Sequence, residues 1–278
     1  MKRKPLVALV TGASSGIGEA TAVALAAAGY TVYGTSRRGA QTAPRAFKLL
    51  ALDVTNDQSV DAAVNELLQL EGRIDLLVNN AGFGVSPAAA EESSIEQAKA
   101  ILDTNFLGVV RMTRAVLPHM RKQGGGRIIN IGSIIGLVPT PYAALYAASK
   151  HAVEGYSEAV DHELRSYGIR VTVIEPAYTK TLFEANNLAP DAPLETYTQV
   201  RTQVGKVVAQ AMANADEPAV VADVVVKAAR AAHPKVRYTA GKIAGQLQVL
   251  RRFVPAGVFQ ALIRKNLQLD TKAAARAS

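Results

Sequence analysis

Short apolar runs alternate with helical patterns along this chain, and that alternation most narrows the folds open to it. Seven such runs occur, at residues 6–10, 31–35, 47–52, 75–78, 127–131, 169–174 and 236–239. The first, Leu-Val-Ala-Leu-Val, is apolar throughout, as expected of a strand buried on both faces of a sheet. Strands that alternate with helices form βαβ units. The sequence therefore predicts an α/β fold with a seven-stranded parallel sheet and helices on both faces.

Composition indicates one domain over residues 1–278, since 49% of the chain is hydrophobic and no stretch has the character of a linker. The absence of cysteine excludes disulfides, thiolate metal sites and a cysteine nucleophile, and it fits a reducing cytoplasm. We expect no signal peptide, and no apolar run reaches the ~18 residues of a membrane span. The net charge of +8 is spread along the chain. A phosphate-bearing small molecule explains it as well as nucleic acid does, and we expect no nucleic-acid partner.

A glycine-rich turn, Thr-Gly-Ala-Ser-Ser-Gly-Ile-Gly, directly follows the first predicted strand and opens a helix. Glycines at 12, 16 and 18 let the backbone turn tightly and approach a pyrophosphate, which the amides at a helix N-terminus bind. An ordinary strand-to-helix turn is the alternative. The strand, turn and helix context favours dinucleotide binding.

The end of the second predicted strand bears on which dinucleotide binds. NAD calls for an acidic residue there, whereas NADP calls for arginine beside its 2′-phosphate. No Asp or Glu lies between Tyr30 and Lys48, whereas Arg37 and Arg38 stand at the expected place. NADP(H) is therefore favoured over NAD(H), although two arginines after a strand also occur simply in solvent. Asp53, closing the third strand, is placed to accept a hydrogen bond from an adenine amino group or to begin a helix, a role for which Asn56 and Asp57 compete.

A tyrosine and a lysine that could take part in catalysis lie four residues apart, at Tyr146 and Lys150. Residues at i and i+4 share one helix face, which brings the ammonium beside the phenol. A phenol ionises near pH ~10, and a pKa near 7 requires roughly 4 kcal/mol of phenolate stabilisation. One positive charge at ~4 Å supplies about that much at an effective dielectric of ~20. The pair therefore suits general acid/base catalysis, although many helices contain this spacing by chance.

Three further motifs accompany the glycine-rich turn and the tyrosine–lysine pair: Asn-Asn-Ala-Gly at 79–82, Asn105 within a long helical pattern from 95 to 121, and Ser133. With all of them in this order, the chain resembles the short-chain dehydrogenase/reductase family. The resemblance covers about residues 5–240. Asn-Asn-Ala-Gly-Phe-Gly and the later Arg-Tyr-Thr-Ala-Gly-Lys look most like its hydroxysteroid and retinol dehydrogenase-like branch. It implies a doubly wound Rossmann fold, a homodimer or homotetramer formed through the helices of Asn105 and Tyr146, and no metal.

The resemblance also implies residue roles. Tyr146 would exchange the proton while hydride moves to or from the nicotinamide, Lys150 would lower the phenol pKa and hold the nicotinamide ribose, Ser133 would orient the substrate oxygen, and Asn105 would fix a relay water. The expected cofactor contacts are Gly12, Ser14, Ser15, Gly16, Ile17, Gly18, Arg37, Arg38, Asp53, Val54, Asn80, Ala81, Gly82, Tyr146, Lys150, Pro176, Thr179 and Thr181. The expected substrate contacts are Ser133, Ile135, Tyr142, Tyr146, Tyr178 and Phe183. Ala177 replaces the usual glycine after Pro176, which puts the local backbone in question because alanine resists positive φ.

Two segments lie outside the regular alternation. Residues 178–217 follow a strand's carboxyl end, where open sheets bind ligands, and we interpret them as a substrate lid with an apolar lining. Residues 241–278 carry apolar positions at helical spacing beside Arg251, Arg252, Arg264 and Lys265. Such an amphipathic extension contacts a membrane surface or a partner subunit, or most often covers the domain's own apolar surface.

The rival enzyme classes lack their motifs. Ser133 is preceded by Ile131 and Gly132, so the Gly-x-Ser-x-Gly elbow of a serine hydrolase is missing. The four histidines are scattered and form no metal-binding motif. Nucleotide-sugar epimerases share the tyrosine and lysine but use a different glycine spacing. The sequence therefore predicts an NADP(H)-dependent oxidoreductase that interconverts an alcohol and a carbonyl on an apolar small molecule; a non-catalytic NADP-binding regulator or scaffold is the alternative.

Overall fold

A computed structural model of the protein describes residues 4–39, 45–181, 183 and 187–269. Within them, seven strands form one sheet with the order β3-β2-β1-β4-β5-β6-β7, and every neighbouring pair is parallel. The strands are β1 (Val7–Val10), β2 (Thr31–Ser36), β3 (Lys48–Ala51), β4 (Leu76–Asn79), β5 (Gly126–Ile131), β6 (Ile169–Pro176) and β7 (Arg237–Ala240). Each coincides with a predicted apolar run to within two residues, which confirms the predicted doubly wound α/β fold.

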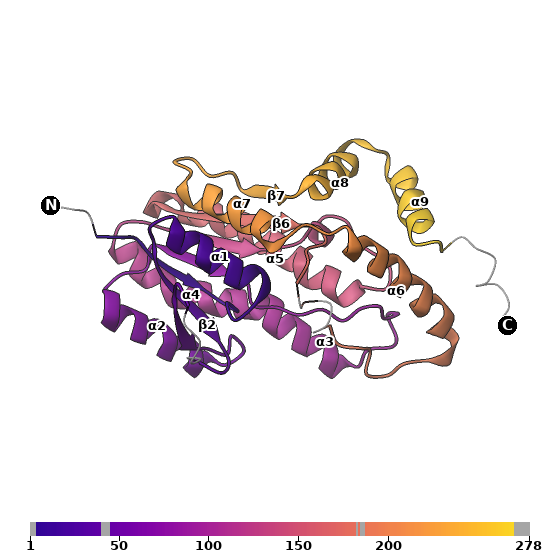
Figure 1. Cartoon of the computed structure of the whole chain (residues 1–278), viewed down its shortest axis with the longest axis horizontal. Coiled ribbons are helices and arrows are strands. Elements are labelled where there is room, and N and C mark those ends of the chain that lie inside the picture. Colours follow the sequence, from indigo (N-terminus) through magenta and orange to yellow (C-terminus); the bar gives the residue numbers. More distant parts are fainter. Residues whose placement is uncertain (1–3, 40–44, 182, 184–186, 270–278) are drawn as a thin grey trace.

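Helices cover both faces of this sheet (Figure 1). One face packs against α1 (Gly16–Ala27) and α7 (Pro218–Arg230), and the other against α2 (Asp57–Glu71), α4 (Gly108–Lys122) and α5 (Ala144–Leu164). Side chains of β1 alternate between the two cores: Val7 and Leu9 belong to one, Ala8 and Val10 to the other. This alternation follows from the two-residue period of a strand and explains why the run has no polar position.

The direction of strand order reverses at β1, with β2 on one side and β4 on the other. The chain leaves both β1 and β4 at the carboxyl edge of the sheet. In open α/β sheets the crevice outside such a reversal binds ligands. The glycine-rich turn after β1 and the Asn-Asn-Ala-Gly turn after β4 therefore meet at the binding edge.

The long helix predicted over residues 95–121 is interrupted. It is divided into α3 (Ile95–Leu102), a π-helical turn over Asp103–Leu107, and α4. The π-helical turn contains Asn105, the polar residue that the sequence placed inside the helix. Such turns widen a helix locally and are frequent at functional sites.

The predicted lid contains regular structure that the sequence did not predict, a 3₁₀ turn (Glu195–Tyr197) followed by α6 (Thr198–Ala213). Valines and alanines recur along α6, yet Val204 is its one buried residue, so most of this helix lies at the surface. Residues 182 and 184–186 of the predicted lid lie outside the described part of the chain.

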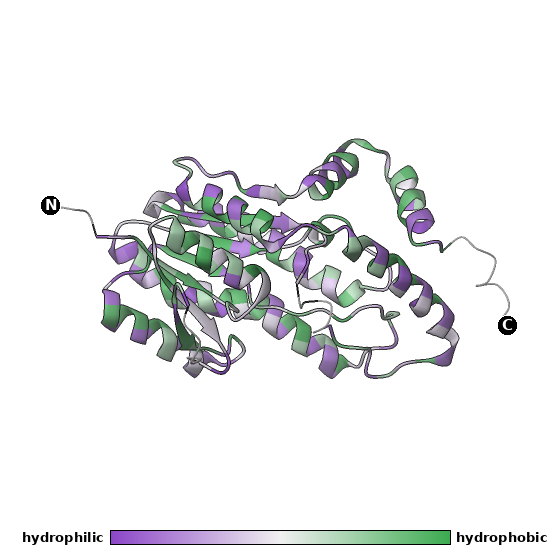
Figure 2. Cartoon of the chain, in the orientation of Figure 1, coloured by the Kyte–Doolittle hydropathy of each residue, from purple (hydrophilic) through white to green (hydrophobic). Residues whose placement is uncertain are grey.

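The C-terminal extension forms α8 (Lys242–Phe253) and α9 (Ala256–Asn266), which arch beside α6 (Figure 1). Both helices carry hydrophobic and hydrophilic residues, as Figure 2 shows. One face covers the domain, because Ala244 and Phe259 pack with Ile134 and Val138 of the segment after β5. The prediction that the extension covers the domain's own apolar surface is confirmed for this face. Residues 270–278 of the predicted extension lie outside the described residues.

Candidate active site

A cleft of about 1680 Å³ runs along the carboxyl edge of the sheet. At one end lie the turns after β1, β2 and β4, and at the other lie α6, α8 and α9. The expected site residues that line it are Gly12, Ser14, Ser15, Gly16, Ile17, Arg37, Arg38, Asp53, Val54, Asn80, Ala81, Gly82, Ser133, Ile135, Tyr146, Lys150, Pro176, Tyr178, Thr179, Thr181 and Phe183.

The glycine-rich turn has the shape that a close ligand requires. Gly12 and Gly16 have φ values of +64° and +59°, a backbone conformation that other residues seldom adopt. Gly18 does not line the cleft; a Cβ there would lie 2.3 Å from the Gly12 carbonyl oxygen, so its role is to let α1 approach the turn. The helix begins at Gly16, which directs its N-terminal amides toward the cleft.

Asn80 joins the turns after β1 and β4. Its side-chain amide donates to the carbonyl oxygens of Thr11 and Gly12 at 3.0 and 3.1 Å. The Thr11 hydroxyl in turn accepts from the backbone amides of Asn80 and Ala81. Asn80 therefore bridges the two neighbouring loops, and the bridge fixes the floor of the cleft.

Arg37 and Arg38 follow β2 directly and are exposed at the cleft. Asp53 lies across from them, and its Oδ1 accepts from the Thr55 hydroxyl at 2.7 Å and from the Thr55 amide at 2.9 Å. These hydrogen bonds, helped by the charge of Arg37, lower the pKa of Asp53. Asn56 rather than Asp53 caps α2, because its side chain accepts from the Ser59 amide.

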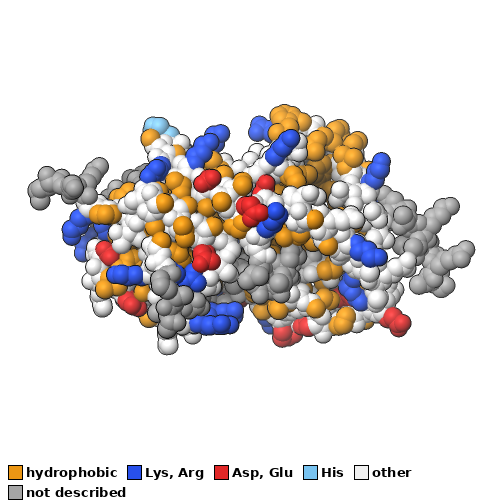
Figure 3. Space-filling model, in the orientation of Figure 1, with side chains coloured by type: hydrophobic (Ala, Val, Ile, Leu, Met, Phe, Trp, Pro, Cys, Tyr) orange, Lys and Arg blue, Asp and Glu red, His pale blue; other side chains and the backbone are white. Residues whose placement is uncertain are grey.

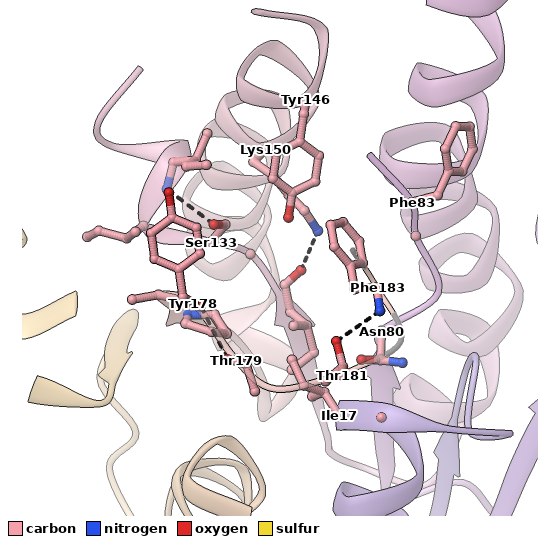
Figure 4. A pocket seen from close by; sticks show the side chains of 18 of the residues that line it. Ile17, Asn80, Phe83, Ser133, Tyr146, Lys150, Tyr178, Thr179, Thr181 and Phe183 are labelled. Carbon is pink, nitrogen blue, oxygen red and sulfur yellow. Dashed lines mark hydrogen bonds between the residues drawn. The ribbon is translucent and has the colours of Figure 1, made fainter. Parts of the chain in front are cut away.

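Tyr146 and Lys150 lie side by side on one face of α5 and point into the cleft (Figure 4). The Lys150 nitrogen lies 5.7 Å from the centre of the Tyr146 ring. Lys150 is buried and donates to the carbonyl oxygen of Ile131 at 2.8 Å, which fixes its position relative to β5. Burial lowers the pKa of Lys150 to about 8, against the opposing charge of Glu154.

Ser133 stands at the same end of the cleft, two residues beyond β5 (Figure 4). It caps the 3₁₀ turn Ile134–Gly136, because its hydroxyl oxygen accepts from the Ile135 amide at 3.2 Å. That bond occupies an acceptor position and leaves the hydroxyl proton for another partner. Ser133, Tyr146 and Lys150 therefore converge at one place.

Asn105 is placed beside the site rather than in it. It is 1% exposed and does not line the cleft, although its neighbour Thr104 does. Its side-chain amide donates to Ser149 at 3.1 Å and also binds the backbone of Phe83. The expected role in fixing a relay water remains a prediction.

The apolar end of the cleft agrees in part with the predicted substrate contacts. Phe183 packs on Tyr146 with ring centres 5.6 Å apart, and Ile135 and Tyr178 also line the cleft. Tyr142 does not line it: this residue has a φ of +62°, and its carbonyl oxygen accepts from Ala88 on the opposite side of the loop. The expected contact between Tyr142 and the substrate stays a prediction.

Ala177, where the family has glycine, causes no local strain, because it is not among the residues with positive φ. Pro176 and Ala177 line the cleft with Thr179 and Thr181. A Cβ on Gly16 would lie 3.2 Å from the side chain of Thr181, so the turn after β1 and the segment after β6 face each other closely.

The model of the short chain dehydrogenase family matches residues 6–191, well over half of the chain. The chain belongs to the short-chain dehydrogenase family. Its relatives include 3-ketodihydrosphingosine reductase of Bacteroides thetaiotaomicron, 45% identical over 183 residues that cover 66% of this chain and 67% of the relative. Another is mouse 17-beta-hydroxysteroid dehydrogenase type 1, 36% identical over 255 residues that cover 84% and 73%.

Two similar solved structures contain nicotinamide dinucleotides. One is a short-chain dehydrogenase/reductase from Burkholderia phymatum in complex with NAD, with a TM-score of 0.76, 25% identity, and coverage of 91% of this chain and 95% of that one. The other is a short-chain dehydrogenase from Burkholderia cenocepacia in complex with NADP, with a TM-score of 0.73, 26% identity, and coverage of 96% and 99%. The present protein has the features that such a cofactor requires at the carboxyl edge of its sheet, namely glycines that permit close approach and a helix N-terminus.

The sequence did not predict the part of the cleft lining that comes from α6, α8 and α9. The missed residues are Val207, Gln210, Ala211, Met212, Asn214, Ile243, Leu247, Leu250, Phe259, Leu262 and Ile263. Their helical spacing was visible in α8 and α9 and indicated an amphipathic extension. No local pattern says which surface an amphipathic helix will cover, so its place over the cleft needed the structure.

Proposed function

We propose that this dehydrogenase interconverts an alcohol and a carbonyl on a long apolar molecule, with NADP(H) as cofactor. One observation carries the proposal: Tyr146, Lys150 and Ser133 converge where the polar part of the cleft meets its apolar part. A reacting carbon at that junction lies beside both the cofactor end and the proton donor.

A bound nicotinamide supplies the hydride for reduction and accepts it in oxidation. The hydroxyl of Tyr146 donates the proton that the carbonyl oxygen takes up, so a C–H and an O–H bond form as the C=O double bond is reduced. The ammonium of Lys150 stabilises the phenolate left behind, and the Ser133 hydroxyl holds the oxygen of the substrate in place. Oxidation of the alcohol reverses each transfer.

The residues after β2 support NADP(H) over NAD(H). Arg37 and Arg38 are exposed at the cleft, where guanidinium groups bind a phosphate through paired hydrogen bonds. No Asp or Glu lies between Tyr30 and Lys48, so this segment offers no carboxylate to hold a ribose 2′-hydroxyl.

The apolar lining from α6, α8 and α9 supports a substrate with a long hydrocarbon part. Leu247, Phe259 and Ile263 extend the cleft well beyond the catalytic groups, in continuity with Phe183 and Ile135. The similarity to 3-ketodihydrosphingosine reductase agrees with a ketone on a long aliphatic chain. We also propose a homodimer or homotetramer formed through α4 and α5, and a cytoplasmic location in keeping with a chain that contains no cysteine.

The decisive experiment measures loss of reduced-nicotinamide absorbance with NADPH and a series of aliphatic ketones, aldehydes and quinones. We expect turnover by the wild type, a loss of at least about a hundredfold in kcat for Tyr146→Phe, and no change for Tyr167→Phe, which alters an exposed tyrosine outside the cleft. NADPH binding without turnover of any substrate would instead identify a regulator or scaffold. Equal activity of both variants would exclude the proposed proton donor.

A further inference from the structure

Large apolar side chains remain exposed on α8 and α9. Phe253, at 74%, is the most exposed large hydrophobic residue in the described part of the chain. Figure 3 shows hydrophobic side chains gathered at the top right, over the helical arch seen in Figure 1. The residues that we call the apolar ridge are Ile243, Val249, Leu250, Phe253, Val258 and Leu262.

The ridge is not an unfinished part of the core. Ala244 and Phe259, on the inner side of the same helices, already pack against the domain. Arg251 fixes this arrangement, since it donates to the Leu137 carbonyl oxygen at 3.2 Å and lies over the Phe259 ring. The two helices therefore carry apolar side chains that pack on the domain and others that are exposed to solvent, and exposed apolar surface of this kind usually marks an interaction site.

Positive charge accompanies the ridge. Residues 241–269 contain five basic residues and no Asp or Glu, so this short segment carries +5 of the chain's net charge of +8. Arg252 lies against the Phe253 ring, and Lys265 is exposed on α9. The segment repels a second copy of itself but attracts an anionic surface.

The ridge also reaches the mouth of the cleft. Ile243, Leu250 and Leu262 are exposed, yet they line the cleft as well. The ridge therefore shares apolar side chains with the cleft, through which an apolar molecule would pass from a surface bound to the ridge.

We propose that the apolar ridge and its basic residues dock this protein on the surface of an anionic phospholipid bilayer. Amphipathic helices of this kind place their apolar side chains at the boundary of headgroups and acyl chains, while Lys and Arg bind lipid phosphates. None of the helices in the described part of the chain has the length and apolar character of a membrane span. The contact that we propose is with the bilayer surface. Docking on a bilayer goes beyond the proposed reaction and does not depend on it. Delivery of a substrate from the bilayer to the cleft rests both on docking and on the proposed function.

The test is flotation of the full-length protein with vesicles, without cofactor or substrate. We expect binding to vesicles that contain phosphatidylglycerol and much weaker binding to pure phosphatidylcholine. Phe253→Ser should lower the partition coefficient about tenfold, because one exposed aromatic ring is lost from the contact. Arg252→Gln and Lys265→Gln should each lower it about fivefold at low salt.

Two matched variants control for general surface effects. Leu70→Ser removes an exposed apolar side chain from α2, and Lys122→Gln removes an exposed positive charge from the end of α4; neither should alter vesicle binding. The proposal is overturned by equal binding to both vesicle types, by ridge variants that bind like wild type, or by a ridge that instead mediates self-association without vesicle binding. Turnover of a short water-soluble ketone is measured on the same variants. Turnover without vesicle binding would mean that only the docking proposal fails, whereas vesicle binding without turnover would mean that only the proposed function fails.

Discussion

Asn105 binds both backbone polar groups of Phe83. Its Oδ1 accepts from the Phe83 amide at 3.0 Å, and its Nδ2 donates to the Phe83 carbonyl oxygen at 2.8 Å. Asn105 lies in the π-helical turn between α3 and α4, so the break in the helix places an amide group opposite the loop that follows β4. That loop includes Gly82, which lines the cleft. Asn105 is therefore a positioning residue for one wall of the cofactor end.

Replacement of Asn105 by alanine should lower the free energy of unfolding by about 2 kcal/mol, because two buried backbone groups of Phe83 lose their partners. It should also weaken NADPH binding about tenfold, since the loop after β4 loses its anchor. Urea unfolding and a fluorescence titration measure the two effects. Asn65→Ala, an exposed change on α2, should affect neither. Lost stability with unchanged NADPH affinity would show that the clamp does not position the cleft.

The sequence was sufficient for the fold because its signals are local. The strand runs make alternating contacts with two cores, as Val7 and Ala8 illustrate. A short run that is apolar at every position is typical of a strand covered on both faces. The proposed catalytic pair was equally visible, because Tyr146 and Lys150 are four residues apart in one helix and need no long-range contact to face the same way.

The apolar end of the cleft was less predictable, because it depends on contacts between distant segments. The lining from α8 comes from a helix that follows the last strand, and its spacing alone fits any apolar partner. Tyr142 does not line the cleft, and its left-handed backbone conformation, with a φ of +62°, has no signature in the sequence pattern around it. The π-helical turn was missed because its residues fit an ordinary helix equally well.

Lys150 illustrates a conflict between stability and the proposed chemistry. Burial holds its pKa near 8 instead of 10.5, so below that pH the buried charge costs roughly 3 kcal/mol at ~1.36 kcal/mol per pH unit. Lys150→Met should therefore raise the free energy of unfolding at pH 7 by about 1–3 kcal/mol, partly offset by the lost bond to Ile131, while kcat falls at least about a hundredfold.

The pH dependence provides an independent check on Lys150. Between pH 8 and 10.5 the native protein binds fewer protons at this residue than the unfolded chain, so its stability rises with pH over that range. The methionine variant should lack this rise. Urea unfolding of both proteins without cofactor measures it, and parallel stability curves would mean that the lysine is well hydrated.

Glu175 of β6 should make the free energy of unfolding depend on pH in the opposite direction. It is buried beside Glu154 and Arg237, and its Oε2 accepts from Gln248 of α8 at 3.2 Å. Burial, followed by the charge of Glu154, raises the pKa of Glu175 to about 7. The native state therefore binds more protons than the unfolded chain between pH 4.5 and 7, and this residue's contribution to stability falls as pH rises through that range.

Glu175→Gln should remove that fall and raise the free energy of unfolding at pH 8 by about 2 kcal/mol, since an amide replaces a buried charge. The two proteins should differ little near pH 4.5. Glu66→Gln, on the exposed side of α2, should leave the pH profile unchanged. A variant less stable than wild type at pH 8 would show that the carboxylate is held by its contact with Arg237.

Arg37 and Arg38 should determine the choice of cofactor. Replacing both by glutamine removes two guanidinium groups from the place proposed for the 2′-phosphate, and each such charged hydrogen bond is worth about 1.5–3 kcal/mol. We expect kcat/KM for NADPH to fall at least about tenfold and that for NADH to change by less than about threefold. Steady-state rates with the two cofactors measure this, and an equal fall for both would assign the arginines a structural role.

Leu262 offers a test of the length of the substrate. It lines the far end of the cleft and is still half exposed, so a larger side chain there narrows the cleft without overfilling the core. Leu262→Trp should lower kcat/KM for a long-chain ketone at least about tenfold, because each excluded methylene forfeits apolar contact, and should leave a short ketone within about twofold. Gln260→Trp adds the same ring to α9 outside the cleft and should leave kcat/KM unchanged for both ketones. If Leu262→Trp instead slows both ketones equally, the hydrocarbon part of the substrate does not extend beneath α9, and the proposed chain length is too great.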